Sequence, residues 1–490
     1  MNKNPNDVLL AVITATTPRC LTKKFTLRKG ELQKHAGGIL VEGSADVVSV
    51  EGLSAFRKLL LELRTNQALS YGIPAAASVR LTTKEKWLEE GRPEGTIPRT
   101  ADMFRWPEGG GVLMLDYDPP LDGIPLNREG LVSALRRAVP GLCDAAMLWW
   151  PSASSFIINT ETGQQVRGLR GQRLYILVAN ASDIPRAGKA FTEALWAAGS
   201  GYFAVSTSGS LLSRTIFDGS VWQTNRLDFA AGAACRAPLR QERGEPVLVP
   251  GVVEFVDTET AIPDPTAEIK AEAHAARDRT RDAVRAEGEA VREAWIEDRV
   301  GKLVPDNADD DTRDAARATV KRAVENSTLS GDFTVQIIEG NEPRAVTVVE
   351  VLDDPSRYDG MLTLDPLEPD YDGGRVVGKL YTAGARPNLF SFAHGGRTFR
   401  LMRQPARIEI VKGRTHDVVQ ATLETLRRAS EAFDFGGALV TVITSSMSLL
   451  ELLANVNGIF AAAAARASAV SPRYQTNPAG PVGPINRGRS

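Results

Sequence analysis

Gly110-Gly-Val-Leu-Met-Leu-Asp-Tyr-Asp-Pro119 is an apolar run that ends in two carboxylates, Asp116 and Asp118. We expect this apolar run to form a β-strand. Side chains two residues apart on a strand project from the same face, so both carboxylates would then point at one spot. Carboxylate oxygens suit Mg²⁺ or Mn²⁺, and the phosphates of a bound nucleotide would supply further oxygen ligands. The pattern indicates half of a metal site; the alternative is an ordinary strand end that runs into an Asp-Pro turn.

Four further motifs follow in chain order: Trp149-Trp-Pro-Ser-Ala-Ser-Ser155, Gly168-Leu-Arg-Gly-Gln-Arg-Leu-Tyr-Ile-Leu-Val178, Ser208-Gly-Ser-Leu-Leu-Ser-Arg-Thr-Ile-Phe-Asp218 and Val221-Trp-Gln-Thr-Asn-Arg-Leu-Asp-Phe229. The second is a basic, glycine-rich turn that leads into a strand with apolar residues at a period of two. This order resembles the archaeo-eukaryotic primase superfamily, and more closely the primase-polymerases that prophages and mobile elements encode. The resemblance covers roughly residues 7–245, and the segment from Arg99 to Asp118 is its most specific part.

The resemblance implies a catalytic metal site. In that family two carboxylates of the first motif and one of the third bind divalent metal, which makes Asp116, Asp118 and Asp218 the implied catalytic and metal-binding residues. Asp218 follows the apolar pair Ile216-Phe217, as the third motif requires, and Asp228 is the fallback. A polymerase needs two metal ions, one to lower the pKa of the attacking 3′-hydroxyl and one to stabilise the leaving pyrophosphate. The implied cofactor is therefore Mg²⁺ or Mn²⁺.

The second motif departs from the family, because Arg173 stands where relatives usually carry a histidine. An arginine is always protonated and can hold a phosphate by two parallel hydrogen bonds, so nucleotide binding can survive the exchange, whereas proton transfer by a histidine cannot. Arg214, Arg226 and Ser208 are the other candidates for binding nucleotide or template phosphates. For the two arginines, the alternative is an ordinary surface or carboxylate-paired residue.

Composition bounds the remaining possibilities. The chain has 490 residues and a net charge of only −2, so it lacks a basic field over the whole protein, and nucleic acid would have to bind local patches such as Arg167, Arg170 and Arg173. Three separated cysteines and four scattered histidines argue against a zinc finger. The small number of cysteines favours a reducing compartment, the cytoplasm. Residues 8–15 are expected to form a first strand rather than a signal peptide.

The chain is predicted to be an α+β protein in four parts. Residues 1–245 form a primase-polymerase-like domain with a mixed sheet and helices over 50–69 and 185–198. The stretch that follows the first helix, residues 66–72, also recurs in the family's substrate-side region; the alternative is a helix that simply ends before a Gly. Residues 246–330 are expected to be a charged helical linker with a turn at 305–311, whose consecutive acids mark a helix start rather than a metal site.

Residues 331–465 resemble the α+β segment that joins a primase domain to a helicase, with strands expected over 333–338 and 345–349. His394 lies in a Gly-Gly hairpin turn, where we expect its ring to bond to the backbone rather than to serve a functional role. An amphipathic helix is predicted over 418–433, closed by Gly436-Gly437, and a buried helix rather than a membrane span over 439–465. Residues 466–490 are predicted to be a disordered tail.

Three functions remain open. The favoured one is template-directed primer synthesis or extension, with single-stranded DNA and nucleoside triphosphates as partners. Because the sequence has no Gly-x-x-x-x-Gly-Lys-Ser/Thr loop, the helicase motor is expected on a separate chain, unless this gene is truncated. The second is a catalytically impaired replication-initiation protein that binds DNA and recruits a helicase through residues 331–455. The third is a metal-dependent glycosyltransferase or nuclease, which leaves the later motifs unexplained.

Overall fold

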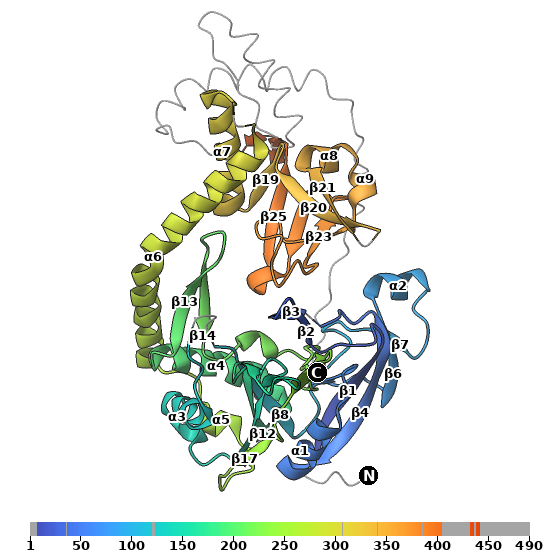
Figure 1. The fold of residues 1–490 in the computed structure, drawn as a ribbon, viewed down its shortest axis with the longest axis vertical. Coiled ribbons are helices and arrows are strands. Elements are labelled where there is room, and N and C mark those ends of the chain that lie inside the picture. Colours follow the sequence, from blue (N-terminus) through green and yellow to red (C-terminus); the bar gives the residue numbers. More distant parts are fainter. Residues whose placement is uncertain are drawn as a thin grey trace, which may run out of the picture.

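The computed structural model describes residues 7–35, 37–119, 123–305, 307–340, 342–384, 386–403, 432–435 and 438–441 (Figure 1). Helix and strand have nearly equal shares, so the predicted α+β class is confirmed. Within these ranges, no helix combines the length and the apolar character needed to cross a membrane.

The first sheet has the strand order β5-β1-β4-β6-β7. Its strands are β1 (Asp7–Thr17), β4 (Glu42–Glu51), β5 (Gln67–Ser70), β6 (Ser78–Thr82) and β7 (Thr96–Pro98). The first strand confirms the prediction for residues 8–15. Helix α1 (Gly52–Glu62) buries Leu53, Phe56 and Leu60, which share one helical face, in the core beside this sheet.

The helix predicted over 50–69 is wrong in its second half. Helix α1 ends at Glu62, and the residues that follow form the edge strand β5 in antiparallel pairing with β1. Ala68 and Leu69 are fully buried, and the backbone of Leu69 exchanges two hydrogen bonds with Asp228. Pairing with chain segments far away in the sequence therefore overrides the local helical pattern.

The second sheet is built around β12 (Gln172–Val178), which pairs with β8 and β9 in antiparallel and with β18 in parallel orientation. Its other strands are β8 (Gly111–Tyr117), β9 (Met147–Pro151), β17 (Val247–Val249) and β18 (Phe255–Val256). Helices α3 (Arg128–Ala138) and α4 (Ile184–Ala197) cover one face. The helix predicted over 185–198 is confirmed.

Both faces of β8 are buried, which explains its unbroken apolar sequence. Leu113 and Leu115 pack on the side of α3 and α4, whereas Val112 and Met114 pack toward α1 and the first sheet. By the alternation of side chains along a strand, Asp116 falls on the same face as Met114, between the two sheets.

Smaller elements surround these sheets. They are β2 (Lys24–Arg28), β3 (Glu31–His35) and β15 (Ala234–Cys235); β10 (Ile157–Asn159), β11 (Gln165–Arg167) and β16 (Leu239–Gln241); the hairpin of β13 (Gly201–Val205) and β14 (Leu211–Thr215); and helix α2 (Lys84–Glu89).

The predicted charged helices are confirmed. After the short α5 (Thr258–Ala261), α6 (Ala267–Leu303) is capped by Thr266 and α7 (Asp310–Asn326) by Asp309. Asp309 accepts a hydrogen bond of 2.8 Å from the Thr312 backbone N–H, so this acidic run starts a helix, as expected. Strands β17 and β18, which follow residue 245, belong to the second sheet rather than to the helical segment.

The third region contains a seven-stranded sheet with the order β19-β25-β24-β23-β22-β20-β21. Its elements are β19 (Thr328–Ser330), β20 (Thr334–Glu339), β21 (Glu342–Thr347), α8 (Val348–Asp353), α9 (Pro355–Tyr358), β22 (Leu362–Thr363), β23 (Gly378–Tyr381), β24 (Asn388–Ser391) and β25 (Arg397–Met402). Both predicted strands are present, but the second ends at Thr347, which caps α8.

Two expectations for the third region need correction. His394 lies in the predicted turn, yet its Nε2 atom is 2.9 Å from the Glu368 carboxylate instead of bonding to the backbone. The chain at 432–435 and 438–441 forms the antiparallel strands β26 (Ala432–Phe435) and β27 (Ala438–Thr441), not helix. A Gly-Gly pair between apolar runs also suits a two-residue hairpin. The rest of the helices predicted over 418–433 and 439–465, and the tail at 466–490, lie outside the described residues.

Candidate functional site

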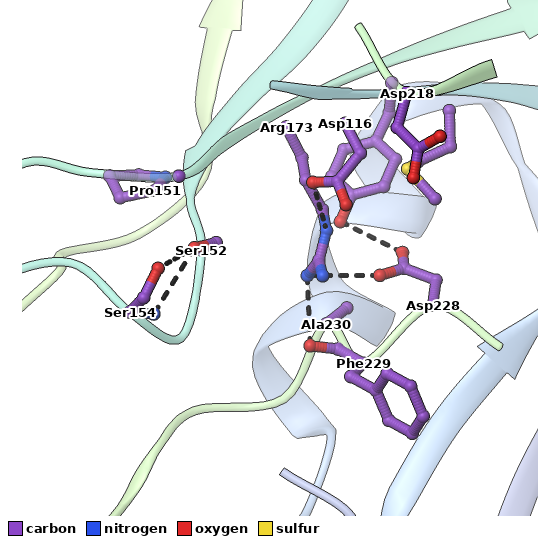
Figure 2. A network of polar contacts seen from close by, with 12 residues as sticks. Asp116, Pro151, Ser152, Ser154, Arg173, Asp218, Asp228, Phe229 and Ala230 are labelled. Carbon is purple, nitrogen blue, oxygen red and sulfur yellow. Dashed lines mark hydrogen bonds and ion pairs between the residues drawn. The ribbon is translucent and has the colours of Figure 1, made fainter. Parts of the chain in front are cut away.

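The register of β8 on β12 places Arg173 directly opposite Asp116. Both side chains therefore project from the same face, toward the first sheet. Figure 2 shows the Arg173 guanidinium between Asp116 and Asp228, while Asp218 lies near the end of β8. Three of the motifs that are separated in the sequence thus meet at one end of the second sheet.

Arg173 is only 8% exposed and is held by three groups. Its Nη1 lies 3.1 Å from Oδ1 of Asp228 and donates to the Phe229 carbonyl oxygen at 3.0 Å, and its Nε lies 3.5 Å from Oδ1 of Asp116. The tighter pair, by distance and burial, is the one with Asp228. A guanidinium so placed balances the charge of two carboxylates in a site with little water.

Asp228 has no exposed side-chain surface. Its Oδ1 atom lies near Arg173, and its Oδ2 atom accepts hydrogen bonds from the hydroxyls of Tyr71 at 2.6 Å and Tyr175 at 3.1 Å. Burial raises the pKa of both tyrosines well above the usual value, and the negative charge of Asp228 adds to the shift. Both hydroxyls therefore remain protonated and act as donors, which is the condition for keeping this carboxylate buried.

The acidity of Asp116 is strongly perturbed. Burial raises its pKa to about 7, against the opposing effect of Arg173, and the charges of Asp118 and Asp228 add to the shift. Its side chain keeps 21% of its surface exposed, so solvent is not completely excluded from it. A carboxyl group that titrates near neutrality is typical of functional sites, although structural ion-pair networks also produce such shifts.

Asp118 is exposed just after the end of β8, and the glycine-rich turn brings a serine motif next to it. A Cβ atom on Gly171 would lie 2.7 Å from Oδ1 of Asp118 and 2.6 Å from Oγ of Ser152, so the backbone at Gly171 approaches both side chains more closely than any other residue would allow. Ser152 and Ser154 are buried, and their Oγ atoms are 2.8 Å apart (Figure 2).

Asp218 reaches the site through its backbone. Its N–H donates to the Asp116 carbonyl oxygen at 2.9 Å, while its carboxylate accepts two hydrogen bonds from Ser220, both at 2.9 Å, and caps a short 3₁₀ turn (Gly219–Val221). Arg226 donates to the Ser220 hydroxyl at 3.3 Å. The predicted third acid, Asp218, therefore lies beside β8, and its carboxylate is bonded to the neighbouring Ser220.

The donor chemistry of Asp116, Asp118 and Asp218 fits a hard divalent cation, because all of these ligands are carboxylate oxygens. Their placement does not yet form a ligand set. Across the described ranges, no three or more His, Cys, Asp or Glu side chains are grouped so that they could hold a metal ion. The fallback residue Asp228 is occupied by Arg173 and two tyrosines.

Two cationic side chains to which the sequence assigned no role, Lys23 and Arg99, lie in the same region. Lys23 is half-buried, and its ammonium group has no hydrogen-bond or ion-pair partner among the described residues. Burial lowers its pKa, while the carboxylates of Asp118 and Asp116 partly offset that effect, which places the ammonium group near the acid pair. Burial and then the charge of Arg226 lower the pKa of Arg99, so these two guanidinium groups are neighbours. Arg99 opens the segment that carries the resemblance most specifically, whereas no pattern in the sequence marks Lys23.

The remaining predicted phosphate ligands lie on the β13–β14 hairpin. Arg214 is opposite Tyr202 in the register. Burial raises the pKa of Tyr202, and the charges of Arg214 and Asp118 both act on it, so Tyr202 lies near each of these two residues. Ser208 lies at the hairpin tip, where its backbone N–H and hydroxyl contact the Glu368 carboxylate at 3.2 and 3.1 Å.

Comparison of the chain with family models, with curated proteins and with solved structures finds no match.

Proposed function

We propose that the N-terminal half of the chain binds nucleoside triphosphates and transfers nucleotides onto a nucleic-acid primer or template. The observation that supports this most is the meeting of motifs at the open end of the second sheet. Asp116 lies opposite Arg173 of the adjacent strand, and the backbone N–H of Asp218 bonds to Asp116, although Arg173 and Asp218 follow Asp116 by 57 and 102 positions in the chain. Phosphoryl transfer needs positioned carboxylates and cations more than it needs a protein acid or base.

In this proposal, Asp116, Asp118 and Asp218 would hold Mg²⁺ or Mn²⁺. When bound, the metal would neutralise charge on the reacting phosphate and activate the attacking hydroxyl. Lys23 and Arg226 would bind triphosphate oxygens, because both cationic groups lie beside the acid pair or the third acid. The cytoplasmic location and the separate helicase expected from the sequence belong to the same proposal.

The test is template-dependent incorporation of labelled nucleotides by the purified full chain with Mg²⁺ or Mn²⁺, on primed and unprimed single-stranded DNA. We expect extended products, and we expect Asp116→Ala combined with Asp118→Ala to abolish them while the protein remains folded. The matched control is Glu161→Ala, an exposed acid on a separate turn. Unchanged incorporation by the double variant would remove the proposal.

Arg173 favours a second candidate, a DNA-binding replication protein without catalysis. Its guanidinium pairs with Asp116 and Asp228 at once, so it occupies carboxylate charge that metal ions would otherwise use. Arg173→His tests this directly, since it frees Asp116 and restores the residue type usual in relatives of the resembled family. Under the second candidate, the natural chain binds single-stranded DNA but no metal-dependent nucleotide, and gains nucleotide binding only in the histidine variant. Nucleotide incorporation by the natural chain would exclude this candidate.

A further inference from the structure

We propose that the outer face of the C-terminal sheet is a binding surface for single-stranded nucleic acid. Strands β23, β24 and β25 lie side by side in this sheet (Figure 1). Their register creates two rows of side chains across the strands, Lys379 with Phe390 and Thr398, and Tyr381 with Asn388 and Arg400. The alternate residues on the same strands, Leu380, Leu389 and Phe399, are buried in the core, so both rows project from the opposite face.

Three aromatic rings gather on this outer face. Phe392 follows Phe390 by two residues and is 65% exposed, and the two rings meet edge to face with centroids 4.8 Å apart at 80°. Tyr381 is 44% exposed on the neighbouring strand. Each ring therefore has surface that the protein core does not use. Exposed aromatic faces on a sheet provide stacking platforms for unpaired bases, and such stacking is tolerant of base identity.

Cationic groups stand next to these rings. The Lys379 ammonium is 5.8 Å from the centroid of the Tyr381 ring and also pairs with Glu85 of α2 at 2.6 Å. Arg400 is exposed in the second row, and its guanidinium has no partner among the described residues. Because Glu85 already engages Lys379, Arg400 is the cation of this face that we expect to contact a phosphate. Rings for bases and a cation for phosphates, on one face, are the combination that single strands require. Leu362 extends the first row on β22 and adds apolar surface.

The arrangement of this face favours a nucleic-acid partner. Across the strands, the aromatic rings alternate with Lys379, Asn388 and Arg400, so groups that can contact phosphates and base edges stand beside the rings on which bases would stack. The surface uses no residue of the acid pair and needs no metal ion. The inference therefore stands whether or not the N-terminal site catalyses nucleotide transfer.

The experiment measures binding of the full chain to a fluorescein-labelled oligothymidylate of about 20 nucleotides by fluorescence anisotropy, in EDTA and over a range of salt concentrations. Loss of one base–aromatic stack weakens binding by at least about fivefold, so we expect Phe392→Ala and Tyr381→Ala each to raise Kd by that factor or more. Arg400→Gln should raise Kd and reduce the slope of log Kd against the logarithm of the salt concentration by about one, as expected for the loss of one phosphate contact. Lys58→Gln, an exposed lysine on α1, is the matched charge control and should leave Kd unchanged.

Phe392→Leu separates stacking from apolar contact, because leucine keeps apolar surface but has no ring. It should weaken binding nearly as much as alanine does. An oligouridylate and a DNA duplex of equal length show whether the surface distinguishes RNA from DNA and single from double strands, and we expect the duplex to bind less tightly. Thermal melting confirms that each variant is folded.

Three results would overturn the inference. The first is no binding of the single strand by the natural chain, and the second is binding by the three variants on the face that is as tight as that of the natural chain. The third is normal binding by Phe392→Leu, which would point to an apolar protein partner. Asp116→Ala combined with Asp118→Ala keeps oligothymidylate binding in EDTA if the inference holds. Failure of the catalytic proposal is thereby distinguishable from failure of this one.

Discussion

The Arg173 guanidinium holds together carboxylates from two different parts of the chain, and one of them, Asp228, has no contact with solvent. An ionised carboxylate in such a place is stable only while its partners remain, because solvent cannot replace them. The two tyrosine hydroxyls satisfy one oxygen, and Arg173 supplies the opposite charge at the other. The same cation therefore has a structural role that is independent of any role in phosphate binding.

We expect Arg173→Met to lower the free energy of unfolding by about 3–5 kcal/mol, because it leaves a buried charge without its partner. Adding Asp228→Asn to that variant should recover a large part of the loss, since the uncompensated charge is then removed. Urea denaturation of the single and double variants measures both effects. The control is Arg240→Met, whose ion pair with Glu242 is exposed and worth under about 1 kcal/mol. Equal losses in Arg173→Met and Arg240→Met would contradict this account.

At the scale of elements, the site depends on a strand and a turn that approach each other closely. The end of β8 carries the acid pair, and the turn before β12 carries Gly171, which lies against both Asp118 and Ser152. The nearest atoms to an added Cβ are the ends of these two side chains rather than backbone. A methyl group there would move the side chains of the site and leave the strands in place.

Gly171→Ala should therefore change the free energy of unfolding by less than about 1 kcal/mol, yet reduce nucleotide incorporation by about a hundredfold, the effect expected when reacting groups are displaced by about 1 Å. Denaturation and incorporation assays on the same preparation measure both quantities. Gly168→Ala in the same turn is the control, because a Cβ there meets only the Gln165 side-chain amide at 3.2 Å. A Gly171→Ala protein with full incorporation would show that the turn does not position the acid pair.

Elements with a strong local signal could be predicted from the sequence, and elements defined by distant partners could not. Helix α4 has helical periodicity and a proline in its first turn, and α6 and α7 have charge patterns together with capping residues. Strand β8 is a short apolar run between turn residues. Strand β5 exists because β1 and Asp228 pair with it, so its local sequence looked helical. Asp228, Tyr71 and Tyr175 likewise meet only in the folded chain, and no spacing in the sequence relates them.

At the scale of the whole molecule, the β13–β14 hairpin connects the N-terminal half with the third region. At its tip, Ser208 contacts Glu368, whose other oxygen bonds to His394. Glu368 is 5% exposed, and although burial favours its neutral form, hydrogen bonds from His394 and Ser206 lower its pKa to about 2. From the sequence, Ser208 is a candidate for phosphate binding and His394 a turn residue. Nothing in the sequence relates them, because the carboxylate between them lies 160 residues beyond Ser208.

This buried carboxylate predicts a dependence of stability on pH. A carboxyl group whose pKa is lowered in the folded state stabilises the fold above its unfolded pKa near 4.3, and that stability is lost as the pH falls toward 2. This difference between the unfolded and folded pKa of Glu368 corresponds to roughly 3 kcal/mol of folding free energy. Glu368→Gln should therefore be less stable than the natural chain at pH 7 and lose less stability on acidification to pH 3. Urea denaturation at both pH values measures this, with the exposed Asp370→Asn as control.

The same variant tests whether the hairpin tip couples the two halves. If Glu368 holds the tip, then Glu368→Gln should let the third region unfold before the N-terminal half, because Ser208 and His394 lose their shared charged acceptor. Hydrogen exchange should then report faster opening at β24 and β25, with unchanged protection in β8 and β12. Loss of protection in both halves together, at the same denaturant concentration as in the natural chain, would mean that the contact does not join them.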